Sequence, residues 1–331
     1  MSVIAPLGPG LHLDIPAARY HEDPCATPSL SSSIAETIVV RTPRHAWFAH
    51  PRLNPDFETD EGNAAMALGS VAHELILGRG GGIEIVDADD WRTKAAKEAR
   101  QAATDAGRTA VLSGTMADAE RIRDAAVAEL RARPDCANFF DNGARSEVVG
   151  IWHDIGGALC RMMIDRLTPA GTIYDLKVSG RGLDDRALAN SMEDGYGLRA
   201  AFYLRGAAAL HPEMAGRLRY RWIFVESKPP HAVRVVTADA RTLALGDRTA
   251  ALGIEKWRRC LATGDWPSYP RQVETVGVAD WTEKRVMDRE AIDPDAARMM
   301  VSGRPDPVSI YEPDPIPYGE YPRRLENHDA T

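Results

Sequence analysis

Three short runs rich in β-branched and aromatic residues lie close together in the middle of the chain, at residues 146–152, 158–167 and 172–178. Turn-forming segments at 153–157 and 168–171 separate them. Connections of four or five residues join neighbouring strands only in antiparallel pairs. The pattern therefore predicts an antiparallel β-meander, and any fold for this chain must be built around it.

Helical patterns occur on both sides of this meander along the chain. Apolar residues recur with helical spacing at 63–77, 91–106 and 116–132, and again at 194–209 and 245–261. Two further strands are expected at 219–227 and 231–237, on either side of Lys228-Pro229-Pro230. We therefore expect an α/β fold in which helices flank a mixed sheet with a central antiparallel meander.

Prolines accumulate beyond about Ile292, in the segments RPDP and EPDPIPYGEYP. Proline lacks a backbone donor and disfavours regular structure. We expect one domain at residues 1–290, with a mostly helical first half, and an extended or disordered proline-rich tail at 291–331.

Composition limits the class of protein further. The formal charge of −8 does not favour a nucleic-acid binder, although a basic groove on an acidic protein would reconcile the two. No apolar run approaches the roughly 20 residues that span a bilayer, so we expect no membrane partner and a cytoplasmic location. The four cysteines are far apart and form no CxxC pair, so we expect reduced, scattered thiols.

Two acidic residues are expected to face each other in the second hairpin. If its turn centres on Ala170, Asp165 lies opposite Asp175. Directly opposed like charges are destabilising unless something compensates them, and a divalent cation is the natural compensation. Because side chains alternate between faces, Lys177 shares the face of Asp175 while Leu176 points into the core.

A third carboxylate, that of Glu147, is expected within a residue or so of Asp165 on the preceding strand. Oxygen ligands at this density suit Mg²⁺ or Mn²⁺, which acidify bound water and stabilise charge on a phosphodiester. Lys177 would position that water or stabilise the transition state. The alternative is an exposed strand face with solvated charge pairs, and spacing alone does not decide between the two.

An ordered set of motifs resembles the RecB-family nucleases of the PD-(D/E)xK superfamily. The motifs are the GxxxH of Gly69 to His73, the acidic Glu147, Asp165, and the D-x-K of Asp175-Leu176-Lys177. The resemblance implies a restriction-endonuclease-like core. It also implies that His73, Asp165, Asp175 and the carbonyl of Leu176 ligate metal, that Lys177 is catalytic, and that Glu147 holds a second metal or orients water.

The chain most resembles phage-type exodeoxyribonuclease VIII within that family. The matching segments are Tyr20-His21, ALGSVAH at 67–73, RWIFVE at 221–226 and GDWP at 264–267. The resemblance implies a Mg²⁺-dependent (or Mn²⁺-dependent) exonuclease acting 5′ to 3′ on the ends of linear double-stranded DNA in phage or prophage recombination within a bacterial host. It also implies a homo-oligomer, and the tail is a candidate contact for a single-strand annealing protein.

Two departures from the family pattern affect the substrate contacts. Arg199 stands where a glutamine usually precedes Tyr203 by four residues, and Met163-Ile164 stands where Arg-Pro is usual. Arg199 and Tyr203 are retained as candidate substrate-binding residues. Arg161 is a third candidate, for a phosphate contact, although a plain surface arginine fits it equally well. Some relatives carry an iron-sulfur cluster, but the late part of this chain offers only Cys260, so none is expected.

Two rival functions remain open at this stage. One is a structure-specific or sequence-specific endonuclease of the same superfamily. The other is a DNA-binding or assembly protein that kept the nuclease fold without turnover, which Arg199 faintly favours and the intact Asp165, Asp175 and Lys177 oppose.

Overall fold

The computed structural model describes residues 5–58, 64–154 and 156–295. The chain divides into two compact units, Met1–Ser268 and Tyr269–Thr331, a boundary earlier than the expected residue 290. In the second unit, α10 (Asp280–Ile292) buries none of its residues. Most of the proline-rich tail, from residue 296, lies outside the described residues, so the expectation for it stays a prediction.

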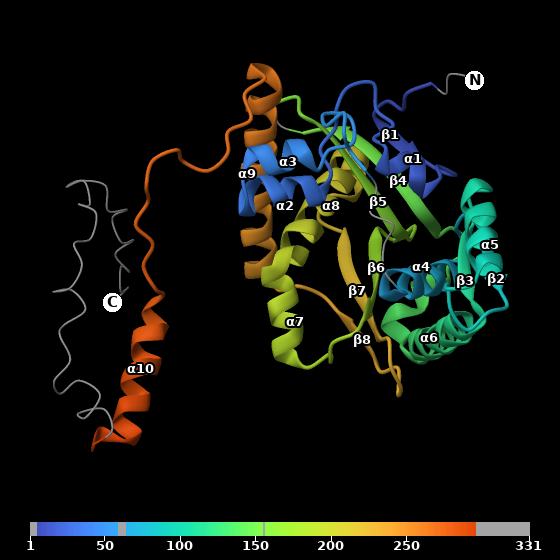
Figure 1. The fold of residues 1–331 in the computed structure, drawn as a ribbon. Helices are drawn as coiled ribbons and strands as arrows, with labels where there is room; N and C mark the ends of the chain where they lie inside the picture. The colour runs from blue at the N-terminus through green and yellow to red at the C-terminus, as the bar shows by residue number, and fades with distance from the viewer. Residues whose placement is uncertain (1–4, 59–63, 155, 296–331) are drawn as a thin grey trace. The chain divides into compact units, whose positions relative to one another are not determined.

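A six-stranded mixed sheet forms the centre of the first unit (Figure 1). Its order is β1 (Gly10–His12), β4 (Arg145–His153), β5 (Leu159–Leu167), β6 (Thr172–Ser179), β7 (Arg219–Glu226) and β8 (Val233–Val236). Only β6 and β7 pair in parallel, while the other neighbours are antiparallel. The predicted meander is β4-β5-β6, and the predicted mixed sheet flanked by helices is confirmed.

The helices occupy both faces of this sheet. They are α1 (Ala17–His21), α2 (Ser32–Val40), α3 (Pro43–Phe48), α4 (Ala64–Leu77), α5 (Lys94–Asp105), α6 (Ser113–Ala132), α7 (Asp185–Ser191), α8 (Gly197–Leu210) and α9 (Ala240–Thr263). Shorter helical turns are η1 (Pro134–Phe140), η2 (Met192–Tyr196) and η3 (Pro212–Met214). Each of the five predicted helical stretches overlaps one of these helices, namely α4, α5, α6, α8 or α9.

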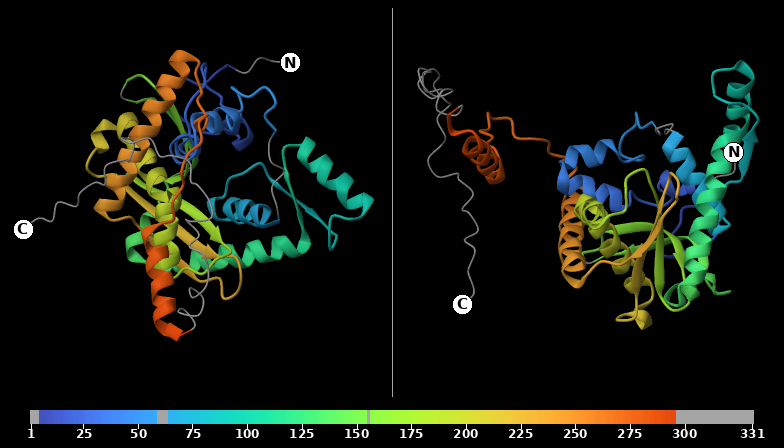
Figure 2. Two further views of the ribbon diagram at one scale, coloured as in Figure 1. Left: turned by 60° about the vertical axis from the view of Figure 1, so that its left-hand side comes forward. Right: turned by 90° about the horizontal axis from the view of Figure 1, so that it is seen from below.

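Two apolar cores separate these helices into layers. On one face of the sheet, α2, α8 and α9 pack over a core that contains Trp152, Trp222 and Trp257. On the other face, α4 and α6 pack over a core that contains Leu176 and Val225. A small parallel pair, β2 (Ile83–Val86) and β3 (Thr109–Leu112), contacts α4, α5 and α6 at the margin of that second layer (Figure 2).

The position of β6 explains why its motif is largely buried. It is the fourth of six strands, and it pairs with β5 on one side and β7 on the other. The α7–α8 segment makes the long crossover that a parallel β6–β7 pair requires. Ile173 on β6 belongs to the first core, whereas Tyr174 and Leu176 belong to the second. A charged residue on this strand therefore lies in protein rather than in open solvent.

The start of α8 differs from the predicted residue 194. Gly195 has φ of +102°, a conformation that glycine adopts without strain, and the preceding turn η2 is of the π type. Regular helix therefore begins at Gly197. No helix in the described residues is both long and apolar enough to cross a membrane.

Candidate active site

The ladder between β5 and β6 stops just before the acidic pair. Its backbone pairs are Leu167 with Ile173 and Arg166 with Tyr174. One further step in this register places Asp165 opposite Asp175, as the hairpin predicted. The N–H group of Leu176 donates instead to Asp165 Oδ2, at 2.8 Å, so the carboxylate takes a backbone donor and is anchored to the D-x-K strand.

Glu147 lies opposite Asp165 on β4, since the pairs on either side are Ser146 with Arg166 and Val148 with Ile164. Residues two apart on a regular strand share a face. Here Ser146 donates to the carbonyl of Leu77 on α4, whereas Val148 packs in the core beneath α8. The strand turns over at Glu147, whose φ is +52°, and this directs its carboxylate toward α4.

His73 on α4 reaches both of these carboxylates. Its Nε2 lies 3.0 Å from Asp165 Oδ2, and its Nδ1 lies 3.9 Å from Glu147 Oε1. Burial alone would lower the pKa of His73, but the charge and hydrogen bond of Asp165 raise it above its ordinary value. Burial would raise the pKa of Asp165, and the charges of His73 and Lys177 hold it well below its usual range. These two groups form an ion pair.

Asp175 is held from two strands. Lys177 Nζ donates to Asp175 Oδ1 and, at 3.2 Å, to the carbonyl of Leu176. Tyr220 Oη on β7 donates to Asp175 Oδ2, at 2.9 Å. Burial and the nearby charge of Asp165 raise the pKa of Asp175, and Lys177 opposes this shift. The pKa of Lys177 is also raised, because Asp175 and Asp165 outweigh its burial.

Arg199 and Tyr203 come to the same region from α8. The Arg199 guanidinium lies over the ring of Tyr196 at 5.6 Å. Burial would lower its pKa, but the charge of Asp175 raises it. The rings of Tyr203 and Tyr220 meet edge to face at 6.1 Å. Arg199 therefore lies within electrostatic reach of the carboxylates, while Tyr203 packs against the side chain that holds one of them.

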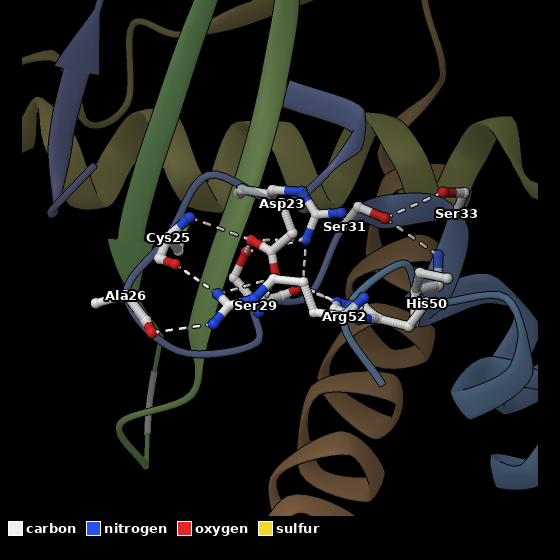
Figure 3. A network of polar contacts seen from close by, with 10 residues as sticks. Asp23, Cys25, Ala26, Ser29, Ser31, Ser33, His50 and Arg52 are labelled. Atoms are coloured by element: carbon white, nitrogen blue, oxygen red, sulfur yellow. Dashed lines mark hydrogen bonds and ion pairs between the residues drawn. The ribbon is translucent and has the colours of Figure 1, made fainter. Parts of the chain in front are cut away.

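Arg161 is not part of this cluster. Its side chain is buried, and Nη1 donates to the backbone oxygen and to the Oγ of Ser29 and pairs with Asp23 at 3.4 Å. Figure 3 shows the surrounding network, in which Asp23, Ser29, His50 and Arg52 converge. Arg161 was a candidate for a phosphate contact or a surface arginine. It is neither in this structure, because its guanidinium is buried and bound to Ser29 and Asp23 of the N-terminal segment.

Tyr220 is the residue that the sequence reasoning missed. Tyr220 pairs with Ile173 in the parallel β6–β7 ladder, and Ile173 lies two residues before Asp175 on β6. Hairpin counting cannot find such a contact, because the strand that lies beside β6 follows after a crossover of two helices. A tyrosine at the start of the strand 219–227 was the only available signal.

Comparison with known families agrees with this geometry. The profile described as a PDDEXK-like domain of unknown function (DUF3799) matches residues 48–277, more than half of the chain. The chain belongs to this family. Every residue of the cluster lies inside the matched range, and the resemblance to the PD-(D/E)xK superfamily is confirmed. Its narrower likeness to exodeoxyribonuclease VIII stays a prediction.

Solved structures support the same PDDEXK-like fold. A crystal structure described as a "Putative exonuclease" from Eubacterium rectale is similar over 85% of this chain and 99% of its own, with 14% identity and a TM-score of 0.52. At that identity the likeness shows the fold alone. A second structure, SSO0001, has 12% identity, covers 59% of this chain and 78% of its own, and has a TM-score of only 0.23, so it carries no argument. No curated protein matches the chain.

PDDEXK nucleases generally use divalent metal ions, and the donor set here fits one in chemistry. It offers carboxylate oxygens of Glu147, Asp165 and Asp175, the carbonyl of Leu176 and a nitrogen of His73, which suit Mg²⁺ or Mn²⁺. In the described part of the chain no three such side chains converge ready-made on one point. The positive charges of His73 and Lys177 neutralise the carboxylates instead.

Proposed function

We propose that this protein is a divalent-metal-dependent deoxyribonuclease that degrades linear double-stranded DNA from its ends. The observation that carries the proposal is the anchoring of Asp165 to the Asp175-Leu176-Lys177 strand through the Leu176 N–H group. That contact joins two carboxylates, a carbonyl and a lysine in one place, with His73 alongside. A family of nuclease-like fold supports the same conclusion.

The residues of the cluster have different proposed roles. His73, Asp165, Asp175 and the Leu176 carbonyl would hold Mg²⁺ or Mn²⁺, and such an ion acidifies water and stabilises negative charge on a phosphodiester. Lys177 lies beside both carboxylates and supplies a compact positive charge to position the attacking water or stabilise the transition state. Glu147, 3.9 Å from His73, orients water or helps to hold a second ion.

The finer features of the proposal follow from the resemblance to exodeoxyribonuclease VIII. They are 5′ to 3′ polarity, a homo-oligomer around duplex ends, a single-strand annealing protein as partner, and phage-type recombination in the cytoplasm of a bacterial host. Arg199 and Tyr203 are the proposed substrate contacts. Arg199, half-buried and within the influence of the Asp175 charge, takes the place of a neutral glutamine and suits a scissile phosphate.

The test is digestion of linear and covalently closed circular duplex DNA with Mg²⁺ by the wild-type protein and by Lys177→Ala. Lys228→Ala is the matched control, because Lys228 is exposed in the β7–β8 connection. We expect the wild type and the control to remove linear DNA only, and Lys177→Ala to be slower by roughly 100-fold or more.

Other outcomes discriminate between the rivals. Cutting of closed circles that Lys177→Ala abolishes would establish an endonuclease. DNA binding without cleavage, under Mg²⁺ and under Mn²⁺, would make the chain a binding protein with the nuclease fold and would overturn the proposal.

A further inference from the structure

Five arginines gather around the short helix η1, at the end of the sheet where β4, β6 and β7 begin. We call this set the arginine patch: Arg131, Arg145, Arg166, Arg219 and Arg221. Arg131, Arg145 and Arg219 are exposed, and the other two are half-buried. They come from α6, β4, β5 and β7, so the patch exists only in the folded chain.

Aromatic rings hold the patch together. Arg131 lies over Phe140 at 5.4 Å, Arg166 over Phe139 at 5.1 Å, and Arg221 over Tyr174 at 5.9 Å. The three rings are themselves in contact, since Phe139 meets both Phe140 and Tyr174 edge to face.

Strand pairing fixes the remaining two members. Arg145 lies one step along the β4–β5 register from the pair Ser146–Arg166. Arg219 lies two residues before Arg221 on β7 and pairs with Thr172 on β6. The five residues therefore gather at one end of the sheet, around η1, where Arg145 donates to the carbonyl of Asn142.

The positive charge of the patch is not cancelled by ion pairs. Within the described residues, the partners of these guanidinium groups are carbonyl oxygens, hydroxyl groups and rings rather than carboxylates. Arg145 donates to Asn142 O, Arg166 to Phe139 O and Ser146 Oγ, and Arg221 to Asp135 O and Tyr174 Oη.

Three acidic residues lie near the patch. Glu129 pairs with Arg133, Asp141 acts on the pKa of Arg166, and Asp135 accepts from Arg221 through its backbone carbonyl. Arg145 is close enough to Arg166 to lower its pKa, an effect second to burial. A chain with a net charge of −8 therefore gathers five arginines at this end of the sheet.

The patch lies next to the candidate active site along the chain but on other side chains. Arg166 follows Asp165 directly, and Tyr174 precedes Asp175. Arg166 reaches Phe139, whereas Asp165 reaches His73 and the Leu176 N–H group. The patch and the carboxylates are therefore carried by neighbouring residues of the same strands, β5 and β6.

We propose that the arginine patch binds the phosphodiester backbone of a DNA strand outside the catalytic carboxylates. The proposal rests on the proposed function for the identity of the ligand. Guanidinium groups that face aromatic rings are the combination that single strands use, with phosphate contacts beside a ring on which an unpaired base stacks. Phe140, 37% exposed under Arg131, is such a ring, and this favours single-stranded over duplex DNA.

The test measures binding without cleavage, so that it does not depend on turnover. Fluorescence anisotropy follows labelled single-stranded and duplex DNA binding to the full chain in EDTA over a series of salt concentrations. The variant carries Arg131→Gln, Arg145→Gln and Arg219→Gln, which are the exposed members of the patch. The matched control carries Arg41→Gln, Arg186→Gln and Arg248→Gln, three exposed arginines that lie just after α2, on α7 and on α9. A third protein carries lysine at the three patch positions.

The logarithm of the DNA association constant falls linearly with the logarithm of the salt concentration. Loss of three phosphate contacts should make this slope less steep by about 2 and weaken binding roughly tenfold at low salt. The control should keep the wild-type slope, and the lysine variant should keep most of it. A larger effect on single strands than on duplex assigns the patch to an unpaired strand, and the reverse order assigns it to duplex.

Equal slopes for the glutamine variant and the control would overturn the proposal, as would wild-type binding that salt does not weaken. Failure of the proposed function shows separately, as intact linear DNA in Mg²⁺, and it leaves this binding result in force.

Discussion

Tyr220 Oη donates a 2.9 Å hydrogen bond to Asp175 Oδ2 from the strand beside it. Lys177 holds the other oxygen of the same carboxylate. Both oxygens of Asp175 are therefore oriented by the protein before any ligand arrives. Groups that orient a metal ligand commonly tune the affinity of the site, which gives Tyr220 a positioning role.

Tyr220→Phe removes this hydrogen bond and little else, because the ring stays. We expect a loss of about 1 kcal/mol in the free energy of unfolding. We also expect the affinity of the site for Mg²⁺ to fall roughly 10-fold to 100-fold. Cleavage rates measured against Mg²⁺ concentration should show this as a shift of the curve that excess Mg²⁺ largely rescues.

The matched control for Tyr220→Phe is Tyr174→Phe. Tyr174 donates a comparable bond to Asn138, at 2.6 Å, from the other face of β6. Its variant should show no shift in the Mg²⁺ curve. An unchanged curve for Tyr220→Phe would remove the positioning role.

Metal binding itself should be visible as stabilisation. If Asp165 is a ligand, Mg²⁺ or Mn²⁺ at about 100 times the dissociation constant adds roughly 2.7 kcal/mol, or about 5 to 10 °C in the melting temperature of a unit of this size. Asp165→Asn should abolish that shift in thermal melts with and without chelator. Asp185→Asn, which removes an exposed carboxylate paired with Arg234, should keep it. An equal shift in both variants would exclude Asp165 as a ligand.

Much of the site was predictable because a short hairpin leaves little choice of register. Counting outward from the turn put Asp165 opposite Asp175, and the observed pairs run to Arg166–Tyr174, one step before that position. Alternation put Lys177 with Asp175 and Leu176 in the core, and both are observed. These are local consequences of strand geometry, which the sequence carries directly.

The features that were not predictable depend on distant segments or on irregular backbone. The positive φ of Glu147 interrupts the regular alternation of side chains between the two faces of β4. Arg161 Nη1 donates to Ser29, 132 residues away in sequence. The glycine of the GxxxH motif has no packing explanation among the described residues, because a Cβ at Gly69 meets no described atom within 4 Å. Neither spacing nor composition contains this information.

The Asp23 network predicts a pH-dependent stability. Burial raises the pKa of Asp23, but hydrogen bonds from His50 and Ser29 and the charge of Arg161 lower it below its ordinary value of 3.8. A depressed pKa means that the contribution is complete above the unfolded value and is lost as the pH falls through the folded value. Asp23→Asn should therefore cost about 3 kcal/mol near neutral pH, and the difference from wild type should shrink below about pH 4.

Chemical denaturation of both proteins between pH 3 and 7 checks this expectation. Glu22→Gln, an exposed neighbour, serves as the control and should differ little from wild type. A difference between Asp23→Asn and wild type that grows toward acid would contradict the assigned sign.

Two glycines on helices should respond in opposite ways to the same added methyl group. At Gly206 on α8 a Cβ would lie 2.8 to 2.9 Å from the ring of Trp152, which is buried and cannot easily move. Gly206→Ala should therefore destabilise the protein by about 1 to 3 kcal/mol. At Gly69 on α4 no described atom lies within 4 Å of the added Cβ, so Gly69→Ala should gain up to about 1 kcal/mol from helix propensity. Thermal melts of both variants give the direction of each change in stability, and cleavage rates show whether activity follows it.

If Gly69→Ala is more stable but cleaves DNA more slowly, the space beside His73 is kept open for substrate or metal rather than for packing. If it is less stable, the interpretation of an open helix face there is wrong.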